Sequence, residues 1–211
     1  MRYIEKIFYV LLVFVLIGCT SQQYRVIPST EDPVNFKRLS IICAKSVMSI
    51  DPDNFSKYRV MIIEQDKINA YIGNYQIAFT NAAMNAFDDN DLHSICAHEV
   101  AHQVLGHYES KQQTAAVTNI SLTVIGLIVP YVGLLNPITG AAITGYFSRE
   151  QERDADDKAV KAIKKMGFSK EQYKATLIKL RDTAPDNLGG GFLSSHPNIN
   201  ERIKNVGEMK E

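Results

Sequence analysis

The sequence lacks any excess of charge. Lys and Arg together number 23, Asp and Glu also number 23, and the formal net charge at neutral pH is +0. A protein that grips nucleic acid through its phosphates needs a basic surface, which this composition does not supply, so we expect no nucleic-acid partner. Repeats and low-complexity tracts are also absent. At 211 residues, 45% of them hydrophobic, the chain has the size and core-forming capacity of one domain.

Cysteine is scarce, with three residues in the chain, and the first stands at the end of a short apolar run. A basic amino terminus precedes this run, Ile7 to Ile17, which is too short to span a bilayer comfortably and has the length of a signal-peptide core. It ends in Leu16-Ile17-Gly18-Cys19, which resembles a lipobox. We therefore expect residues 1–18 to be a lipoprotein signal peptide and Cys19 to be lipidated. An ordinary signal peptide or an uncleaved anchor is the alternative.

Residues 19–31 would then be the lipidated amino terminus and a tether, because Thr20 to Thr30 is polar and contains Pro28. Thr20, rather than an aspartate, follows Cys19, which favours sorting to the outer membrane of a bacterium with two membranes. Acyl chains on Cys19 would attach the protein to the membrane. The expected location is the cell envelope, at the periplasmic face of the outer membrane.

The other two cysteines, Cys43 and Cys96, would lie in a compartment where disulfides persist. Cys96 precedes His98 by two residues, so on a helix it faces away from that histidine and is not expected to bind a metal there. The sequence leaves two interpretations open: a disulfide between the two cysteines, or two buried free thiols that act as small apolar side chains.

No apolar run in the chain reaches the roughly 20 residues that a spanning helix needs. The segment between Lys111 and Arg149 carries no formal charge, but prolines and glycines interrupt it. Three interpretations of this uncharged hydrophobic segment, residues 112–148, stay open. It can be a helical hairpin packed on the domain, an element that dips into the membrane, or a mobile lid over a cleft.

Histidine is also scarce, with five residues, yet two of them stand in His98-Glu99-Val100-Ala101-His102. This H-E-x-x-H motif lies within Asp91 to His107, which we predict to be one helix. Residues four apart share a helix face, so both imidazoles can reach one ion while Glu99 acts as general base on a water molecule. The motif predicts a zinc peptidase. Of the remaining histidines, His107 is expected to support the ligands rather than bind the metal, and His93 to be exposed.

A catalytic zinc ion normally has three protein ligands, so a third must be found. A metzincin would carry glycine and histidine where this chain has Leu105 and Tyr108, which excludes that arrangement. The charged segment Ser148 to Asp156 follows the uncharged one. Within it Glu152 and Asp156 share a helix face, so one carboxylate can bind the metal while the other orients a ligand histidine through its free ring N–H.

Together the segments H-E-V-A-H-Q-V-L-G-H and S-R-E-Q-E-R-D-A-D resemble peptidase family M48, the zinc endopeptidases that include HtpX-type membrane proteases and the CAAX prenyl proteases. The resemblance runs from Pro33 to Val206. Upstream, Ile68-Asn69-Ala70-Tyr71 is similar to the family's N-A-F segment, and downstream Ser195-His196-Pro197 with Glu201-Arg202-Ile203 is similar to H-P-x-x-x-E-R-I. One departure is Ile72-Gly73-Asn74-Tyr75, where many members have a Pro-Gly-Gly turn.

The resemblance implies a single zincin-like (gluzincin) domain over residues 32–211, with a mostly helical α+β fold and a small β-sheet beside the H-E-x-x-H helix. It implies one Zn²⁺ per chain, held by His98, His102 and Glu152, with Asp156 orienting a ligand. It also places His196 beside the metal, where we expect it to stabilise the oxyanion.

A substrate is expected to lie extended along an edge strand near Tyr75 to Thr80, because strand addition reads the backbone and needs little sequence specificity. The candidate substrate-binding residues are Asn69, Ala70, Tyr75 and Ile77. The function that fits is cleavage of unfolded or misassembled envelope proteins by a quality-control endopeptidase. Two alternatives are a chaperone-like or assembly factor that keeps the fold but cleaves little, and an integral membrane protease.

Hydrophobic spacing and capping residues predict the other elements. Helices are expected over 34–49, through Glu152 to a stop at Gly167, from a capping box at Ser169 to Asp182, and after Asn198. Strands are expected over 58–64 and 75–80, and a flexible loop over 186–195.

Overall fold

The computed structural model describes residues 25–110, 147–183 and 191–210. The predicted signal peptide and Cys19 lie outside these residues, as do most of the uncharged hydrophobic segment and the first part of the predicted loop at 186–195.

The described residues form a mostly helical α+β fold, as predicted. Its elements are β1 (Val26–Ile27), α2 (Pro33–Ile50), the 3-10 helix η1 (Pro52–Lys57), β2 (Arg59–Ile63), β3 (Ala70–Gly73), β4 (Gln76–Thr80), α3 (Asn81–Ala86), α4 (Asp89–Val104), α7 (Arg149–Lys165), α8 (Lys170–Thr183), α9 (Phe192–Ser195) and α10 (Ile199–Glu208). Among the helices of this described part, none combines the length and apolar character needed to cross a membrane.

The strands form one sheet in the order β1-β2-β4-β3. β4 runs parallel to β2 on one side and antiparallel to β3 on the other, and β1 is antiparallel to β2. The prediction of an edge strand at 75–80 is therefore wrong, because β4 is hydrogen-bonded along both sides. β3 is the edge strand on that side of the sheet.

The turn between β3 and β4 settles the shape of the hairpin that departs from Pro-Gly-Gly. Asn74 and Tyr75 have φ values of 47° and 62°, a pair of left-handed residues that suits a two-residue hairpin turn. The Tyr75 N–H donates to Oε1 of Gln103 on α4 over 3.0 Å, which holds the turn against that helix. Gly73 is required, since a Cβ there would lie 2.5 Å from the Tyr108 ring.

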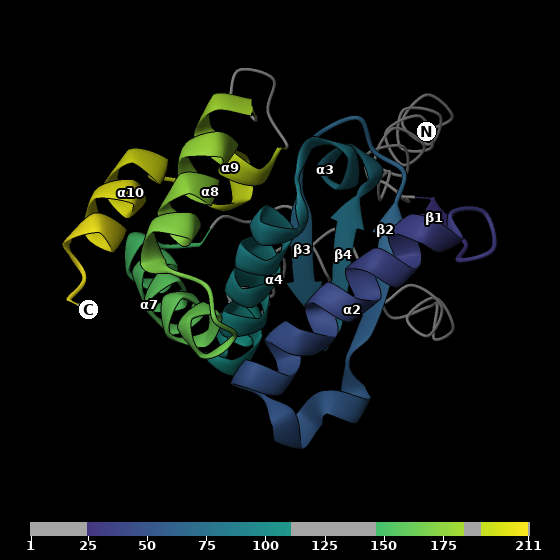
Figure 1. The fold of residues 1–211 in the computed structure, drawn as a ribbon, viewed down its shortest axis with the longest axis horizontal. Coiled ribbons are helices and arrows are strands. Elements are labelled where there is room, and N and C mark those ends of the chain that lie inside the picture. Colours follow the sequence, from purple (N-terminus) through teal and green to yellow (C-terminus); the bar gives the residue numbers. More distant parts are fainter. Residues whose placement is uncertain (1–24, 111–146, 184–190, 211) are drawn as a thin grey trace, which may run out of the picture.

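Helix α4 is the centre of the molecule. Figure 1 shows the strands and α2 on one side of it, with α7, α8 and α10 on the other. One face of the sheet packs into the main core with α2 and α4, and residues of that core include Leu39, Ile42, Ile62, Ile72, Ile77, Phe79, Leu92 and Ile95. Because α4 is buried between the sheet and α2 on one side and α7, α8 and α10 on the other, its side chains have fixed surroundings.

Side-chain caps define where the helices begin. A capping box of Asp88 and Asp91 begins α4, and one of Ser148 and Gln151 begins α7. The predicted box at Ser169 begins α8 and is present, with hydrogen bonds in both directions between Ser169 and Gln172. α7 ends where predicted, because Gly167 adopts a φ of 89° that favours glycine.

Cys43 of α2 and Cys96 of α4 form a disulfide, with a Cα–Cα distance of 5.7 Å. Both residues are fully buried. Of the two interpretations that the sequence left open, the structure shows the bond, and it fixes α2 to the helix that carries the H-E-x-x-H motif.

Candidate metal centre

His98 and His102 lie one turn apart on α4 and turn the same ring nitrogen toward one point. Their Nε2 atoms are 3.0 Å apart, and both side chains are buried. Burial and the neighbouring His98 hold the pKa of His102 well below its ordinary value, which keeps that imidazole neutral and able to bind a metal.

Glu152 reaches the same point from α7. Its Oε1 lies 3.3 Å from Nε2 of His102, and its Oε2 lies 3.5 Å from Nε2 of His98. The helices can pack closely because their buried residues include small ones, Ala97 and Ala101 on α4 and Ala155 and Ala159 on α7. Two imidazole nitrogens and one carboxylate oxygen are a donor set that zinc takes in catalytic sites, so these residues fit the metal.

His196 joins this group from the end of α9. Its Nδ1 lies 3.0 Å from Oε1 of Glu152 and 3.2 Å from Nε2 of His98, and the four donors all fall within 4.8 Å of one another. Phe192 stacks on the His196 ring at 4.3 Å. The described part of the predicted loop at 186–195 is thus a short helix rather than a loop, and it positions His196 beside the predicted ligands.

Glu99 lies next to the donors with its carboxylate buried. Oε1 is 3.3 Å from Nε2 of His196, yet neither carboxylate oxygen accepts a hydrogen bond among the described residues. Buried carboxylates nearly always accept hydrogen bonds, so a pair of unsatisfied oxygens at this position suits a group that receives a proton from a water molecule.

Asp156 orients His98, one of the two roles that the sequence left open for it. Its Oδ1 lies 3.0 Å from Nδ1 of His98, on the opposite side of the ring from Glu152. Tyr173 on α8 donates to the same carboxylate oxygen over 2.7 Å. Burial and the Arg202 charge lower the pKa of His98, but hydrogen bonds to Asp156 and Glu152 outweigh them and raise it to about 9.

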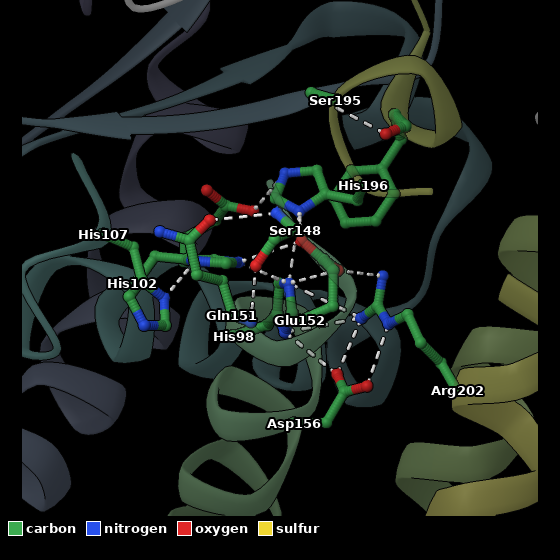
Figure 2. Close-up of polar contacts among 12 residues, drawn as sticks. His98, His102, His107, Ser148, Gln151, Glu152, Asp156, Ser195, His196 and Arg202 are labelled. Atoms are coloured by element: carbon green, nitrogen blue, oxygen red, sulfur yellow. Dashed lines mark hydrogen bonds and ion pairs between the residues drawn. The ribbon is translucent and has the colours of Figure 1, made fainter. Parts of the chain in front are cut away.

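Arg202 on α10 is a central residue of the site for which the sequence alone predicts no role. Figure 2 shows its guanidinium between Asp156 and Glu152. Nε and Nη2 donate to the two oxygens of Asp156 over 2.8 and 2.7 Å, and Nη1 lies 2.7 Å from Oε2 of Glu152. Burial raises the pKa of Asp156, but Arg202 and His98 outweigh it and hold the pKa well below the ordinary range. The only sequence signal was its place in the E-R-I segment.

α4 ends at Val104. The prediction that one helix continues to His107 is therefore wrong for its last three residues. Gly106 adopts a φ of 70°, and the chain turns back so that Nδ1 of His107 lies 2.9 Å from Nδ1 of His102. His107 therefore contacts a ligand, as expected. The prediction that His93 is exposed is wrong, since it is buried against Phe168.

Comparison with known proteins identifies the family of the chain. The model of peptidase family M48 matches residues 35–210, which is most of the chain. The chain belongs to peptidase family M48. The resemblance seen in the H-E-x-x-H and S-R-x-x-E-x-x-A-D segments is thereby confirmed.

Relatives of this M48 family member include three proteases of Escherichia coli K12. Metalloprotease LoiP is 25% identical over 145 residues, covering 66% of this chain and 57% of LoiP, and metalloprotease YcaL is 27% identical over 149 residues with the same coverage. The beta-barrel assembly-enhancing protease is 26% identical over 144 residues, covering 60% of this chain and 29% of that protein. The chain thus matches little more than half of LoiP and YcaL.

The predicted substrate-binding residues of the M48 chain lie in different parts of the sheet, and only some of them remain candidates. Ile77 on the interior strand β4 is fully buried in the core, so its assignment to substrate is wrong. Tyr75 lies in the hairpin turn. Asn69 and Ala70 lie at the start of edge strand β3, where Oδ1 of Asn69 accepts the Ala70 N–H over 2.9 Å. For these three a contact with substrate stays a prediction.

Proposed function

We propose that this M48 peptidase is a zinc-dependent endopeptidase of the bacterial cell envelope that hydrolyses peptide bonds of unfolded or misassembled envelope proteins. The observation that carries the proposal is the convergence of His98, His102 and Glu152 on one point, beside a buried Glu99 whose oxygens accept no hydrogen bond among the described residues.

The residues divide the chemistry among them. A zinc ion held by His98, His102 and Glu152 would supply a water of pKa about 7 and polarise the scissile carbonyl. Glu99 accepts the proton of the attacking water and passes it to the leaving amine. His196 donates a hydrogen bond to the developing oxyanion, an interaction whose loss typically costs on the order of a hundredfold in rate.

The edge of the sheet supports this substrate class. β3 is the edge strand beside α4, so an extended peptide could add to it through backbone hydrogen bonds, which requires an unfolded substrate rather than a particular sequence. The name of one relative, the beta-barrel assembly-enhancing protease, supports a role in the envelope. Lipidation of Cys19 at the outer membrane is the matching proposal for location.

Proteolysis of casein, and of an unfolded outer-membrane protein, tests the function. We expect cleavage that a chelator stops and added zinc restores. Glu99→Gln should bind zinc as the natural protein does and lose at least about a hundredfold in activity, since general bases contribute that much or more. A Glu99→Gln protein that cleaves normally would exclude Glu99 as the base.

The same assay separates the chaperone-like alternative. A factor that holds unfolded proteins without cutting them would suppress their aggregation equally well in its natural form and as the Glu99→Gln variant, and both forms would leave the substrate intact. Intact substrate in the presence of zinc, together with suppressed aggregation, would favour that alternative over the endopeptidase.

A further inference from the structure

The outward side of α2 carries large apolar side chains in a row. Val34 is 76% exposed, Ile41 50% and Met48 54%, and their spacing of one residue every two helical turns places them on one face. Together with the exposed Lys37 and Lys45 on the same face, they form what we call the α2 outer face.

All charged side chains of α2 are basic. α2 contains Lys37, Arg38 and Lys45 but no Asp or Glu, although the whole chain is neutral. Arg38 pairs with Asp89, whereas Lys37 and Lys45 project with the apolar row. Apolar residues flanked by lysines are typical of helices that lie in the interface of an anionic membrane.

We infer that the α2 outer face docks on a surface of anionic phospholipid. The inference rests on the proposed lipidation of Cys19, because that anchor fixes which end of the molecule approaches the membrane. Six residues lead from Cys19 to Arg25, and even fully extended they reach only about 20 Å. The tether therefore keeps β1 and the start of α2 close to the bilayer, because Arg25, just before β1, forms an ion pair with Glu31, just before α2.

The orientation that results suits a protease. Cys96 faces α2, to which it is bonded, and His98 two residues later points away from it, toward Glu152 on α7. With α2 on the lipid, the metal centre lies on the far side of α4, away from the lipid surface. A peptide substrate then reaches Glu99 and the ligands without entering the membrane.

A second copy of the chain fits the α2 outer face less well. A helix seam needs two apolar positions in every seven residues, but of the two positions that would complete the row one holds the charged Lys37 and the other only the small Ala44. An antiparallel copy centred on Ile41 would also oppose Lys37 to Lys45, which is repulsive. An anionic lipid surface attracts both lysines.

The absence of tryptophan from the chain allows a direct test. Ile41→Trp places a single fluorescent reporter in the α2 outer face, and Lys204→Trp places one on exposed α10 at the other end of the molecule (Figure 1). The lipidated proteins are reconstituted on vesicles of phosphatidylcholine with phosphatidylglycerol. We expect brominated lipids to quench the reporter at position 41 and to leave the reporter at position 204 unaffected.

Charge reversal provides the second measurement, on the chain with Cys19→Ala. Lys37→Glu with Lys45→Glu should lower binding to the anionic vesicles by about tenfold or more, given the attraction of each basic residue to such a surface. Lys161→Glu with Lys164→Glu, on the exposed side of α7, is the matched control and should bind as before. Vesicles of phosphatidylcholine alone should bind all of these proteins more weakly.

An unquenched reporter at position 41 in the anchored protein, or equal quenching at positions 41 and 204, would overturn the inference. So would a chain that dimerises in solution with position 41 shielded, which would assign the face to a second copy. Mass spectrometry of the amino-terminal peptide reports acylation of Cys19 separately, and neither fluorescence nor vesicle binding depends on proteolysis. A failed anchor, a failed protease and a failed docking face therefore give different results.

Discussion

The buried guanidinium of Arg202 holds two carboxylates of the candidate metal centre in place. It contacts Asp156 through two nitrogens and Glu152 through the third. Burying two carboxylates without a partner would cost several kcal/mol, so the guanidinium is what makes this arrangement of acids stable. Its planar fork also fixes both carboxylates in orientation, which a lysine in the same place could not do.

Glu152 and Glu150 offer a matched pair for testing the third ligand. Glu152 is buried against the histidines, whereas Glu150, two residues earlier on α7, is exposed. We expect Glu152→Ala to lose tightly bound zinc, and Glu150→Ala to keep about one ion per chain, because a carboxylate oxygen is the third donor. Metal analysis after gel filtration gives the answer. Tight zinc in the Glu152→Ala protein would assign the third ligand elsewhere.

Zinc binding should weaken as the pH falls, because a proton on His98 competes with the metal. Carboxylates raise the pKa of His98 to about 9. Protonation of His98 therefore stabilises the metal-free fold below its ordinary pKa of about 6.5, and this contribution is lost as the pH rises through 9. The apparent zinc affinity should rise about tenfold per pH unit across that window.

A competition titration against a chelator at several pH values measures this dependence. Asp156→Asn removes a carboxylate that raises the pKa of His98, so its zinc affinity should change less steeply with pH. A slope near zero for the natural protein would show that His98 binds the metal without releasing a proton.

At the scale of elements, the disulfide joins α2 covalently to α4. Cys43 and Cys96 are 53 residues apart, and closing a loop of that length restricts the unfolded chain by about 4 kcal/mol. We expect Cys43→Ala with Cys96→Ala to lower the melting temperature by roughly 10 °C. Scanning calorimetry of the natural protein, oxidised and reduced, is the control. Equal melting temperatures for the two forms would mean that the bond does not constrain the unfolded chain.

Elements whose signals are local were predictable from the sequence. Asp32 and Pro33 at the start of α2, Ser169 at the start of α8 and Gly167 after α7 act through their nearest neighbours, so the sequence alone identifies them. β3 was missed because four residues give no period to detect. The sheet order was missed for a related reason, since β2 pairs in parallel with β4 although β3 lies between them in the sequence, and no local signal reports that.

The candidate site also divides into residues that local signals predict and residues that only long-range packing brings together. The H-E-x-x-H spacing brings His98 and His102 together within one helix, and the family resemblance supplied Glu152, Asp156 and His196. Arg202 and Tyr173 were not assigned because their role exists only once α8 and α10 pack against α7. Side chains that act through long-range packing leave no spacing rule in the sequence.

At the scale of the whole molecule, the proposed lipid anchor on Cys19 would determine where the protein resides. We predict that Cys19→Ala, exported with a cleavable signal in place of the native one, becomes a releasable periplasmic protein. The sequence of the uncharged segment contains no run of about 20 apolar residues, and its prolines would leave backbone groups unpaired in lipid. Cell fractionation followed by alkaline carbonate extraction measures the release. A folded, zinc-loaded protein that stays in the carbonate-resistant pellet would instead identify an integral membrane protease.

The candidate metal ligands come from two parts of the chain, residues 25–110 and residues 147–210, which no described element connects directly. His98 and His102 belong to the part that the disulfide binds together, and Glu152, His196 and Arg202 belong to the other. A bound zinc ion would therefore link these two parts of the chain through their side chains. If the backbone between Ser110 and Phe147 were cut, the α4–α7 interface and a bound metal would together keep the two pieces as one particle, and a chelator would weaken that association.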